Sequence, residues 1–242
     1  MLPFHQALLI VPTYNEIDNV EKMLKILTSL YDTLNILIID DGSPDGTADI
    51  VKKYQQSNEK IHLIERSGKL GLGTAYITGF RWALERDYKF VFEMDCDFSH
   101  DPKDLPSLLE AAQKNDLVIG SRYIDGIRII NWPFHRLLLS YCASIYTRVI
   151  TGIDVLDVTG GFKCFTRKAL ESLNLDNVIS NGYSFQVELN YKVWSKGLSV
   201  KEVPIIFTER RDGESKMHGG IVKEAIFAVI MLRVRKIFGT LH

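Results

Sequence analysis

Two acidic residues one position apart follow a short apolar segment near the middle of the chain. Residues 89–94 are mostly apolar and predict a buried strand, and Asp95 and Asp97 come directly after it. Because side chains alternate along a strand, the two carboxylates face the same side if the chain stays extended through Cys96. Ligands of open α/β sheets bind beyond the carboxyl ends of the strands. Two carboxylates there suit Mg²⁺ or Mn²⁺ holding a phosphate-bearing substrate, and a polar turn is the alternative interpretation.

The first half of the chain alternates apolar strand-like segments with segments of helical periodicity. Helices are expected around residues 20–30, 74–85 and 104–114, and Ser43 followed by Pro44 fits the N-cap and first position of another helix. Continuous apolar strands alternating with helices are typical of a parallel sheet covered on both faces. The sequence therefore predicts a doubly wound α/β fold with a mainly parallel sheet. Strands are expected at residues 6–12, 35–40, 61–65, 89–94 and 117–120.

The second half of the chain is less regular. Residues 129–153 are apolar and aromatic and contain an expected helix, and residues 221–238 form an apolar helix with a basic end. Packing in the core and contact with an anionic membrane surface fit this last helix about equally well. Between these segments we expect a short strand within residues 157–166, a helix at 184–195, a strand at 199–208 and a charged loop at 210–216.

The composition excludes several classes of protein. The formal net charge is −1, so no overall positive field attracts nucleic acid. The three cysteines, Cys96, Cys142 and Cys164, match no zinc pattern and indicate a reducing compartment. No secretory signal is evident, and no apolar run reaches the roughly 20 residues that span a bilayer. We therefore expect a cytoplasmic protein that is soluble or peripheral on the cytosolic face of a membrane.

Polar residues also follow the first two expected strands. The dinucleotide-binding pattern Gly-x-Gly-x-x-Gly is absent there. Asp41 ends the second strand, near where an acidic residue contacts a ribose in related folds. Tyr14 is suited to stack on a base and Glu16 to accept hydrogen bonds from its edge, but taken by themselves both residues fit a cap and staple on the first helix better.

A series of motifs in a fixed order gives a sharper indication. Together they closely resemble the dolichyl-phosphate (polyprenyl-phosphate) mannose synthases of glycosyltransferase family 2, over roughly residues 8–220. The last motif and the GSRY element point most narrowly to polyprenyl-phosphate acceptors. The motifs occupy residues 12–16 (PTYNE), 40–47 (DDGSPDGT), 71–73 (GLG), 95–97 (DCD), 120–123 (GSRY), 157–162 (DVTGGF), 182–188 (GYSFQVE) and 210–216 (RRDGESK).

The resemblance implies a Rossmann-like GT-A fold and inverting transfer of mannose from GDP-mannose to a polyprenyl phosphate. Residues 1–220 would form the catalytic domain, and residues 221–242 an amphipathic helix on the membrane surface. Small membrane subunits are conceivable partners. The implied nucleoside contacts are Pro12, Tyr14, Glu16, Ile39 and Asp41, and the implied diphosphate and ribose contacts are Asp95, Cys96 and Asp97.

The resemblance also implies a metal site and a set of phosphate-binding residues. Asp97 and Ser99 occupy the positions that hold Mg²⁺ or Mn²⁺, and Asp157 is the candidate base, although a phosphate acceptor does not require one. His100, beside the carboxylates, is the only histidine that we single out. The phosphate-binding positions are Arg122, Arg136, Arg210 and Lys216, with a surface ion pair as the alternative, above all for Arg136.

Three alternatives remain open at the level of the sequence. Within the same class, the donor could carry glucose or another sugar on the same acceptor. A nucleotidyltransferase also uses an α/β nucleotide site and a carboxylate-bound metal, but it releases pyrophosphate. A non-catalytic nucleotide-binding protein is disfavoured because a complete set of phosphate-binding residues is present.

Overall fold

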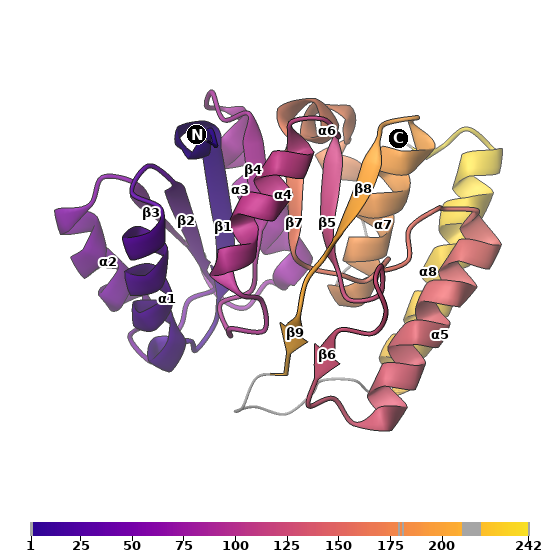
Figure 1. Cartoon of the computed structure of the whole chain (residues 1–242), viewed down its shortest axis with the longest axis horizontal. Coiled ribbons are helices and arrows are strands. Elements are labelled where there is room, and N and C mark those ends of the chain that lie inside the picture. The colour runs from indigo at the N-terminus through magenta and orange to yellow at the C-terminus, as the bar shows by residue number, and fades with distance from the viewer. Residues whose placement is uncertain (1, 179, 181, 210–218, 242) are drawn as a thin grey trace.

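The chain folds around one seven-stranded sheet with helices on both faces (Figure 1). The computed structural model describes residues 2–178, 180, 182–209 and 219–241. Beyond one edge of the sheet, β6 (Ile129–Ile130) and β9 (Phe207–Thr208) pair as a short parallel ribbon. The strands of the main sheet are β1 (Ala7–Thr13), β2 (Asn35–Asp40), β3 (Ile61–Glu65), β4 (Phe90–Glu93), β5 (Leu117–Ser121), β7 (Lys163–Thr166) and β8 (Val200–Pro204).

Eight α-helices connect or flank these strands within the described part of the chain. They are α1 (Ile17–Leu30), α2 (Thr47–Ser57), α3 (Leu72–Leu84), α4 (Leu105–Ala112), α5 (Phe134–Thr151), α6 (Arg167–Ser172), α7 (Gly182–Ser195) and α8 (Gly219–Ile237). Short 3₁₀ helices cover Phe4–Gln6, Pro102–Asp104 and Leu175–Asn177.

The strand order is β3-β2-β1-β4-β7-β5-β8. All neighbouring pairs are parallel except those of β7, which is antiparallel to both β4 and β5. The prediction of a mainly parallel sheet is therefore confirmed. The direction of β7 was not predicted, because the apolar pattern of a short buried strand is the same in either direction.

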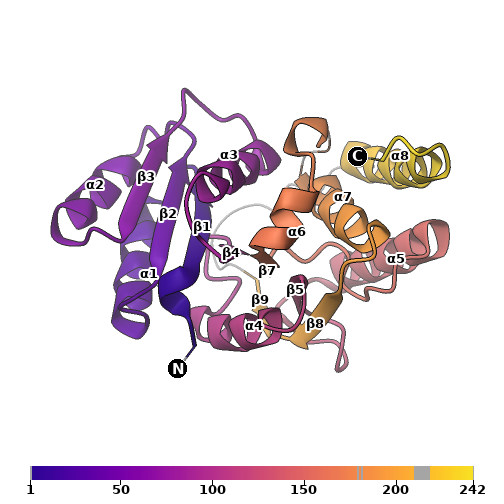
Figure 2. The same ribbon diagram turned by 90° about the horizontal axis from the view of Figure 1, so that it is seen from above.

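Alternation along the strands divides the core into two layers. In β1, Leu8 and Ile10 point to the face covered by α3, α6 and α7, whereas Leu9 and Val11 point to the face covered by α1, α2 and α4. The view from above shows these helices on opposite sides of the sheet (Figure 2). Burial on both faces explains why the strands read as continuous apolar segments.

The helices α5 and α8 lie side by side at one end of the molecule (Figures 1 and 2). The Tyr146 hydroxyl of α5 donates to the Ile226 carbonyl of α8 at 3.0 Å, and Val229 and Leu232 of α8 are buried in the core. One side of α8 therefore packs in the core, while Phe227 and Phe238 remain exposed. Within the described residues, no helix combines the length and apolar character needed to cross a membrane.

Two predicted boundaries are wrong. The strand expected at residues 199–208 is divided, since β8 ends at Pro204 and β9 begins at Phe207 in the separate ribbon. Ser43 does not cap a helix: α2 begins at Thr47, and the Ser43 hydroxyl donates instead to Asp40 at 2.6 Å. The side chain of Asp40 thus holds the turn that precedes the helix.

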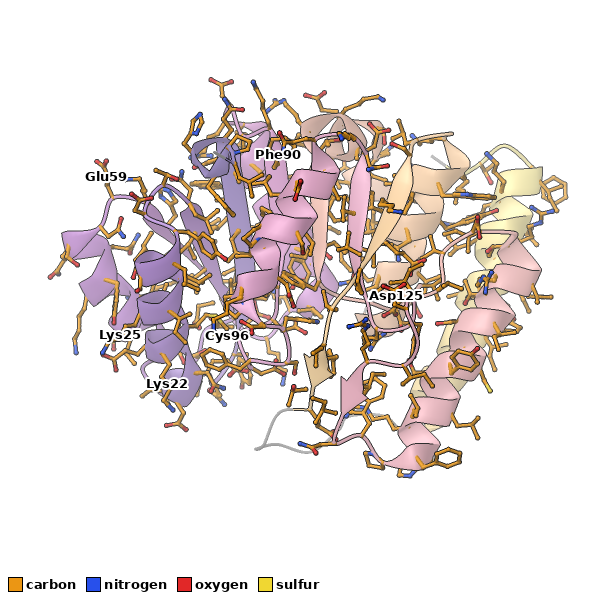
Figure 3. The ribbon with its side chains drawn as sticks, viewed as in Figure 1. Lys22, Lys25, Glu59, Phe90, Cys96 and Asp125 are labelled. Atoms are coloured by element: carbon orange, nitrogen blue, oxygen red, sulfur yellow. The ribbon has the colours of Figure 1, made fainter. Side chains whose placement is uncertain are left out.

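The carboxyl ends of β1, β2, β4 and β5 all lie at one edge of the sheet, the lower edge in Figure 1. Figure 3 shows this direction for β4, with Phe90 at its start and Cys96 just beyond its end. The ribbon of β6 and β9 lies beyond the same edge. Residues from the predicted motifs therefore meet there.

Candidate active site

The chain turns sharply after β4, and this turn shapes the acidic pair. The strand ends at Glu93, residues 96–100 form a bend, and Phe98 has a φ of 59°. The condition for the two carboxylates to share a side was an extended chain through Cys96, and the chain instead bends from Cys96 onward. A left-handed φ is unfavourable for a bulky residue and is typical of functional turns. Within this turn the Ser99 N–H donates to Asp97 Oδ1 at 3.0 Å.

The two carboxylates nevertheless lie close enough to affect each other. Burial, together with the charges of Asp97 and Glu93, raises the pKa of Asp95 to about 7. The Tyr76 hydroxyl donates to Asp95 Oδ1 at 3.4 Å. Burial and the charge of Asp95 raise the pKa of Tyr76. The neighbouring negative charges oppose ionisation of Asp95, and a bound cation would offset this repulsion.

The donor atoms at this turn suit a hard divalent ion. The carboxylate oxygens of Asp97 and the hydroxyl of Ser99 are oxygen ligands of the kind that Mg²⁺ and Mn²⁺ prefer. Among the residues that the structure places, no group of three or more His, Cys, Asp or Glu side chains is arranged so that it could hold a metal ion by itself. An ion here would consequently need further ligands from a phosphate-bearing substrate or water, which is the usual arrangement for Mg²⁺.

Two predicted nucleotide contacts are buried side chains. Ile39 has no exposed surface and lies in the core, where a β carbon on Gly79 would touch it. A contact between the Ile39 side chain and a nucleotide is therefore not supported. Cys96 is also buried, and burial raises the pKa of its thiol well above the ordinary value. The Cys96 thiol is thus a packing group, and only its backbone is suited to face a ligand.

The first two loops at this edge are tied to each other. The backbone N–H groups at the start of α1 are bound by side chains from the loop after β2. Asn15 donates to Ser43 Oγ, Glu16 to Thr47 Oγ1 and Ile17 to Asp45 Oδ2, at 3.0 to 3.1 Å. Much of the DDGSPDGT motif therefore fixes the start of α1.

Asp41 is the best-enclosed acidic residue of the nucleotide-binding candidates. Arg66 Nε donates to Asp41 Oδ1 at 2.6 Å, and the Leu70 N–H donates to Asp41 Oδ2 at 3.1 Å. Arg66 also donates to Thr74 Oγ1 at 2.8 Å. Asp41 thereby anchors the loop between β3 and α3, and the resulting rigid rim runs along the end of β2.

The other nucleoside candidates lie along the same rim. Pro12, Tyr14 and Glu16 are all half-buried at the end of β1 and in the following turn. Lys69 Nζ lies 4.3 Å from the centre of the Tyr14 ring, and the Glu16 carboxylate accepts from Asn19 at 2.7 Å. Both the ring and the carboxylate are therefore held in place, and Tyr14 has a cation against one face of its ring.

The most extensive ion pair of the site joins Arg122, just after β5, to Asp157. Arg122 Nε and Nη2 donate to the two Asp157 oxygens at 2.7 and 2.6 Å, and the Arg122 backbone N–H adds a bond of 2.9 Å. Arg122 also donates to Thr159 at 2.8 Å. Asp157 has no exposed surface. Asp157 therefore acts as the partner that orients Arg122, which argues against its role as a base.

Glu202 of β8 holds the Asp157 loop from the other side. Its carboxylate accepts from the backbone N–H groups of Leu156 and Asp157 at 2.7 and 2.8 Å. Neither Glu202 nor Arg66 was predicted, because neither stands in one of the motifs, and Thr159 was predicted only as a member of the 157–162 motif without a role. They are recognisable only as neighbours of predicted residues in space.

Aromatic contacts bring the acidic turn next to Arg122. Phe207 of β9 lies 5.3 Å from the buried ring of His100 and 5.5 Å from the Arg122 guanidinium. The Thr208 N–H donates to the Ser99 carbonyl at 3.1 Å. Burial lowers the pKa of His100 to about 4, so this ring is neutral at physiological pH. The ribbon therefore joins the acidic turn to the arginine region.

A second basic group lies at the start of α5. Arg136 forms an ion pair with Glu209, and its guanidinium lies 4.2 Å from the centre of the Trp132 ring. The Nε atoms of Arg128 and Arg136 and the Nε1 atom of Trp132 are buried, and none has a hydrogen-bond partner among the described residues. Buried N–H donors without an acceptor are costly. Their arrangement suits an anionic ligand.

The last predicted phosphate-binding residues, Arg210 and Lys216, lie outside the described residues. The structure therefore brings together Asp95, Asp97, Ser99, Arg122, Arg136 and Asp157 at one edge of the sheet, with Pro12, Tyr14, Glu16 and Asp41 along the neighbouring rim. In this arrangement the acidic turn after β4 lies between the rim at the ends of β1 and β2 and the basic region after β5.

The chain belongs to glycosyl transferase family 2, whose family model matches residues 8–174, and its open, mainly parallel sheet with an acidic turn after the central strand fits the GT-A class. It is 44% identical over 224 residues to the undecaprenyl-phosphate mannosyltransferase of Micrococcus luteus, covering 93% of this chain and 92% of that protein. It is 42% identical over 235 residues to the polyprenol monophosphomannose synthase of Mycolicibacterium smegmatis, covering 96% of this chain and 89% of that protein.

The fold is also similar to a solved structure from Mycobacterium tuberculosis, that of glucosyl-3-phosphoglycerate synthase in complex with Mn²⁺ and UDP-glucose. The TM-score is 0.68 at 18% identity, and the match covers 93% of this chain and 77% of that chain. The expected Rossmann-like GT-A fold is thus confirmed, as are the resemblance to polyprenyl-phosphate mannose synthases and the assignment as a glycosyltransferase.

Proposed function

We propose that this protein transfers mannose from GDP-mannose to a polyprenyl phosphate, with inversion at the anomeric carbon. The observation that carries the proposal is the group of buried N–H donors on Arg128, Trp132 and Arg136, beside the Arg122–Asp157 pair. A phosphate monoester supplies the acceptors that these donors lack. The names of the two curated relatives support the same class of acceptor.

In this proposal the nucleoside lies along Pro12, Tyr14, Glu16 and Asp41, and the diphosphate lies at the acidic turn. Asp97 and Ser99 would hold a Mg²⁺ or Mn²⁺ ion there. When bound, such an ion stabilises the negative charge that develops on the departing nucleoside diphosphate. Arg210 and Lys216 are proposed to add positive charge to the same group.

In this proposal Arg122 binds the acceptor phosphate and positions it. Its guanidinium is held by both oxygens of Asp157 and is flanked by aromatic rings, so its direction is fixed before any ligand arrives. A preoriented guanidinium gives up little conformational freedom when it binds a phosphate. The acceptor oxygen can then be placed on the side of the sugar opposite the departing diphosphate.

The proposed reaction is tested with a panel of labelled nucleotide sugars and a short polyprenyl phosphate. GDP-mannose is expected to give a mannosyl phospholipid and free GDP, and EDTA is expected to abolish the reaction. If the protein forms more product from another nucleotide sugar than from GDP-mannose, that nucleotide sugar is the donor and the proposed donor is wrong. Release of pyrophosphate would identify a nucleotidyltransferase instead.

The pH dependence is expected to follow the acceptor rather than the enzyme. A phosphate monoester has a second pKa of about 6 and is mostly a dianion at neutral pH, so it needs no base. The acid limb of kcat/KM against pH should therefore move when a phosphonate of different pKa replaces the phosphate. A limb that stays fixed with both acceptors and disappears in Asp157→Asn would show that the carboxylate is the base.

We propose that α5 contacts the bilayer that carries the acceptor, which would make the protein peripheral on a cytosolic membrane surface. Phe134, Leu138, Tyr141, Ile145 and Val149 are all exposed, and their spacing places them on one side of the helix. Arg136, the proposed phosphate-binding residue, lies in the first turn of the same helix. The neighbouring α8 also has exposed apolar residues, such as Phe227, and small membrane subunits are proposed partners of these helices.

Replacing both ends of this stripe should weaken membrane binding without blocking chemistry. The double variant Phe134→Ser/Val149→Ser is expected to lower binding to anionic liposomes by about tenfold, because two exposed apolar side chains no longer insert. Turnover with a short, soluble acceptor should stay within twofold of the unaltered protein. Leu30→Ser, an exposed position on α1, is the matched control. Equal liposome binding by all three proteins would contradict the assignment.

A further inference from the structure

A buried polar group beneath the acidic turn has no place in the chemistry described so far. It consists of Glu93 of β4, Lys163 of β7 and Gln186 of α7. Glu93 and Lys163 have no exposed surface, and Gln186 is buried as well. Glu93 and Lys163 stand opposite each other in the antiparallel pair. Burying an ionisable pair is costly, so such groups are often kept for a reason other than stability.

Lys163 fixes the direction of the Gln186 amide. Lys163 Nζ donates to Gln186 Oε1, and it also donates to the Gln186 backbone carbonyl at 3.3 Å. Burial lowers the pKa of Lys163 to about 8, so the group is still mostly protonated at neutral pH. An ammonium group has three donors and no acceptor, so the amide oxygen must face it. The amide nitrogen therefore points away from Lys163.

The amide nitrogen and Asp95 both lie close to Gly161, which has no side chain to fill the space between them. A β carbon on Gly161 would lie 3.7 Å from Gln186 Nε2 and 3.9 Å from Asp95 Oδ2. Because both distances are ordinary contacts, the missing side chain leaves room for a ligand group between the two. Asp95 supplies an acceptor on one side and Gln186 supplies N–H donors on the other. Hydroxyl groups, which both donate and accept, match such a pair.

The strand order indicates which part of the donor would lie there. The nucleoside rim is at the ends of β1 and β2, and Arg122 follows β5. The order β2-β1-β4-β7-β5 places β4 and β7 between them. A group bound above β4 and β7 therefore lies between the nucleoside and the acceptor, which is the place of the transferred sugar.

We propose that Gln186 binds a hydroxyl group of the donor hexose through its Nε2 hydrogens, and that Lys163 is a positioning residue that holds the amide in this orientation. The inference rests on the proposed function and deepens it, since it names a residue that recognises the sugar. Burial raises the pKa of Glu93 to about 7, and the neighbouring Lys163 and Gln186 side chains oppose this rise.

The test compares binding of GDP-mannose with binding of GDP, by calorimetry without an acceptor. Gln186→Met and Gln186→Glu are expected to raise the dissociation constant of GDP-mannose by about tenfold or more, because each removes the N–H donors. GDP binding should change less than twofold, since GDP lacks the hexose. Lys163→Met should raise the dissociation constant of GDP-mannose by about three- to tenfold. The double variant Lys163→Met/Gln186→Met should be no weaker than Gln186→Met alone, because Lys163 acts through the amide.

Asn190→Asp is the matched control, an amide-to-acid change one turn further along α7. Its amide donates to the Val158 carbonyl at 2.9 Å and faces the protein interior. It is expected to lower the melting temperature while leaving the ratio of the two dissociation constants unchanged. Parallel weakening of GDP and GDP-mannose in the Gln186 variants, or no weakening at all, would overturn the inference. If the unaltered protein binds GDP but not GDP-mannose, both the proposed donor and this inference are wrong.

Discussion

Replacing Asp97 with asparagine is expected to lower kcat by about 100- to 1,000-fold at saturating donor. The substitution keeps the shape of the side chain and its hydrogen bond from the Ser99 N–H, but it removes one negative charge from the proposed metal site. Losing a preorganised electrostatic contact to a developing charge has effects of this size. The measurement is the initial rate of mannosyl transfer over a range of Mg²⁺ or Mn²⁺ concentrations.

Asp125→Asn provides the matched control for this measurement. Asp125 is exposed in the loop after β5, and the same change of charge there should leave kcat within twofold (Figure 3). If Asp97→Asn remains nearly as active as the unaltered protein at limiting metal, Asp97 is not the metal ligand.

Breaking the pair of Arg122 and Asp157 is expected to have the largest effect on stability. Asp157→Ala leaves the Arg122 guanidinium buried without its main partner, and such a loss costs about 3–5 kcal/mol. The free energy of unfolding from urea denaturation measures this cost. In Asp157→Asn, turnover should fall by about 100-fold, because the guanidinium is no longer held in place for the acceptor phosphate.

A double variant separates the structural role of the pair from its chemical role. Arg122→Met/Asp157→Leu replaces both charges by apolar groups of similar size, and such replacements are often neutral for stability. We expect its unfolding free energy to recover most of the loss seen in Asp157→Ala, whereas turnover stays low. Recovery of turnover together with stability would mean that Arg122 only supports the fold.

Much of the architecture could be predicted from local patterns. The starts and ends of β2 and β3 agree with the predicted ranges to the residue, because apolar segments bounded by polar turns have few alternative assignments. Two predictions were wrong for a common reason: the single strand at residues 199–208 and the start of α2. In both places the chain is held by long-range contacts, such as the pairing of β9 with β6 and the bonds from Asp40 to Ser43.

In the candidate site, too, the types of the residues could be predicted from the sequence, whereas their surroundings could not. The sequence identified the residues at the acidic turn, but it did not predict the turn itself or the left-handed φ of Phe98. It proposed Asp157 as a base, and the structure places both of its oxygens on Arg122. Whether a carboxylate acts as a base depends on which groups surround it, and these come from other parts of the chain.

The amino-acid sequence by itself determined the class of fold, the family and the residues at the carboxyl edge of the sheet. These follow from periodicity and from short motifs, which depend only on neighbours along the chain. Only the tertiary structure decided how those residues are paired. It placed Ile39 in the core, joined Asp41 to Arg66, and directed the Gln186 amide toward Gly161 through Lys163. Hydrogen bonds and burial act between residues that are distant in sequence, so one-dimensional patterns do not carry them.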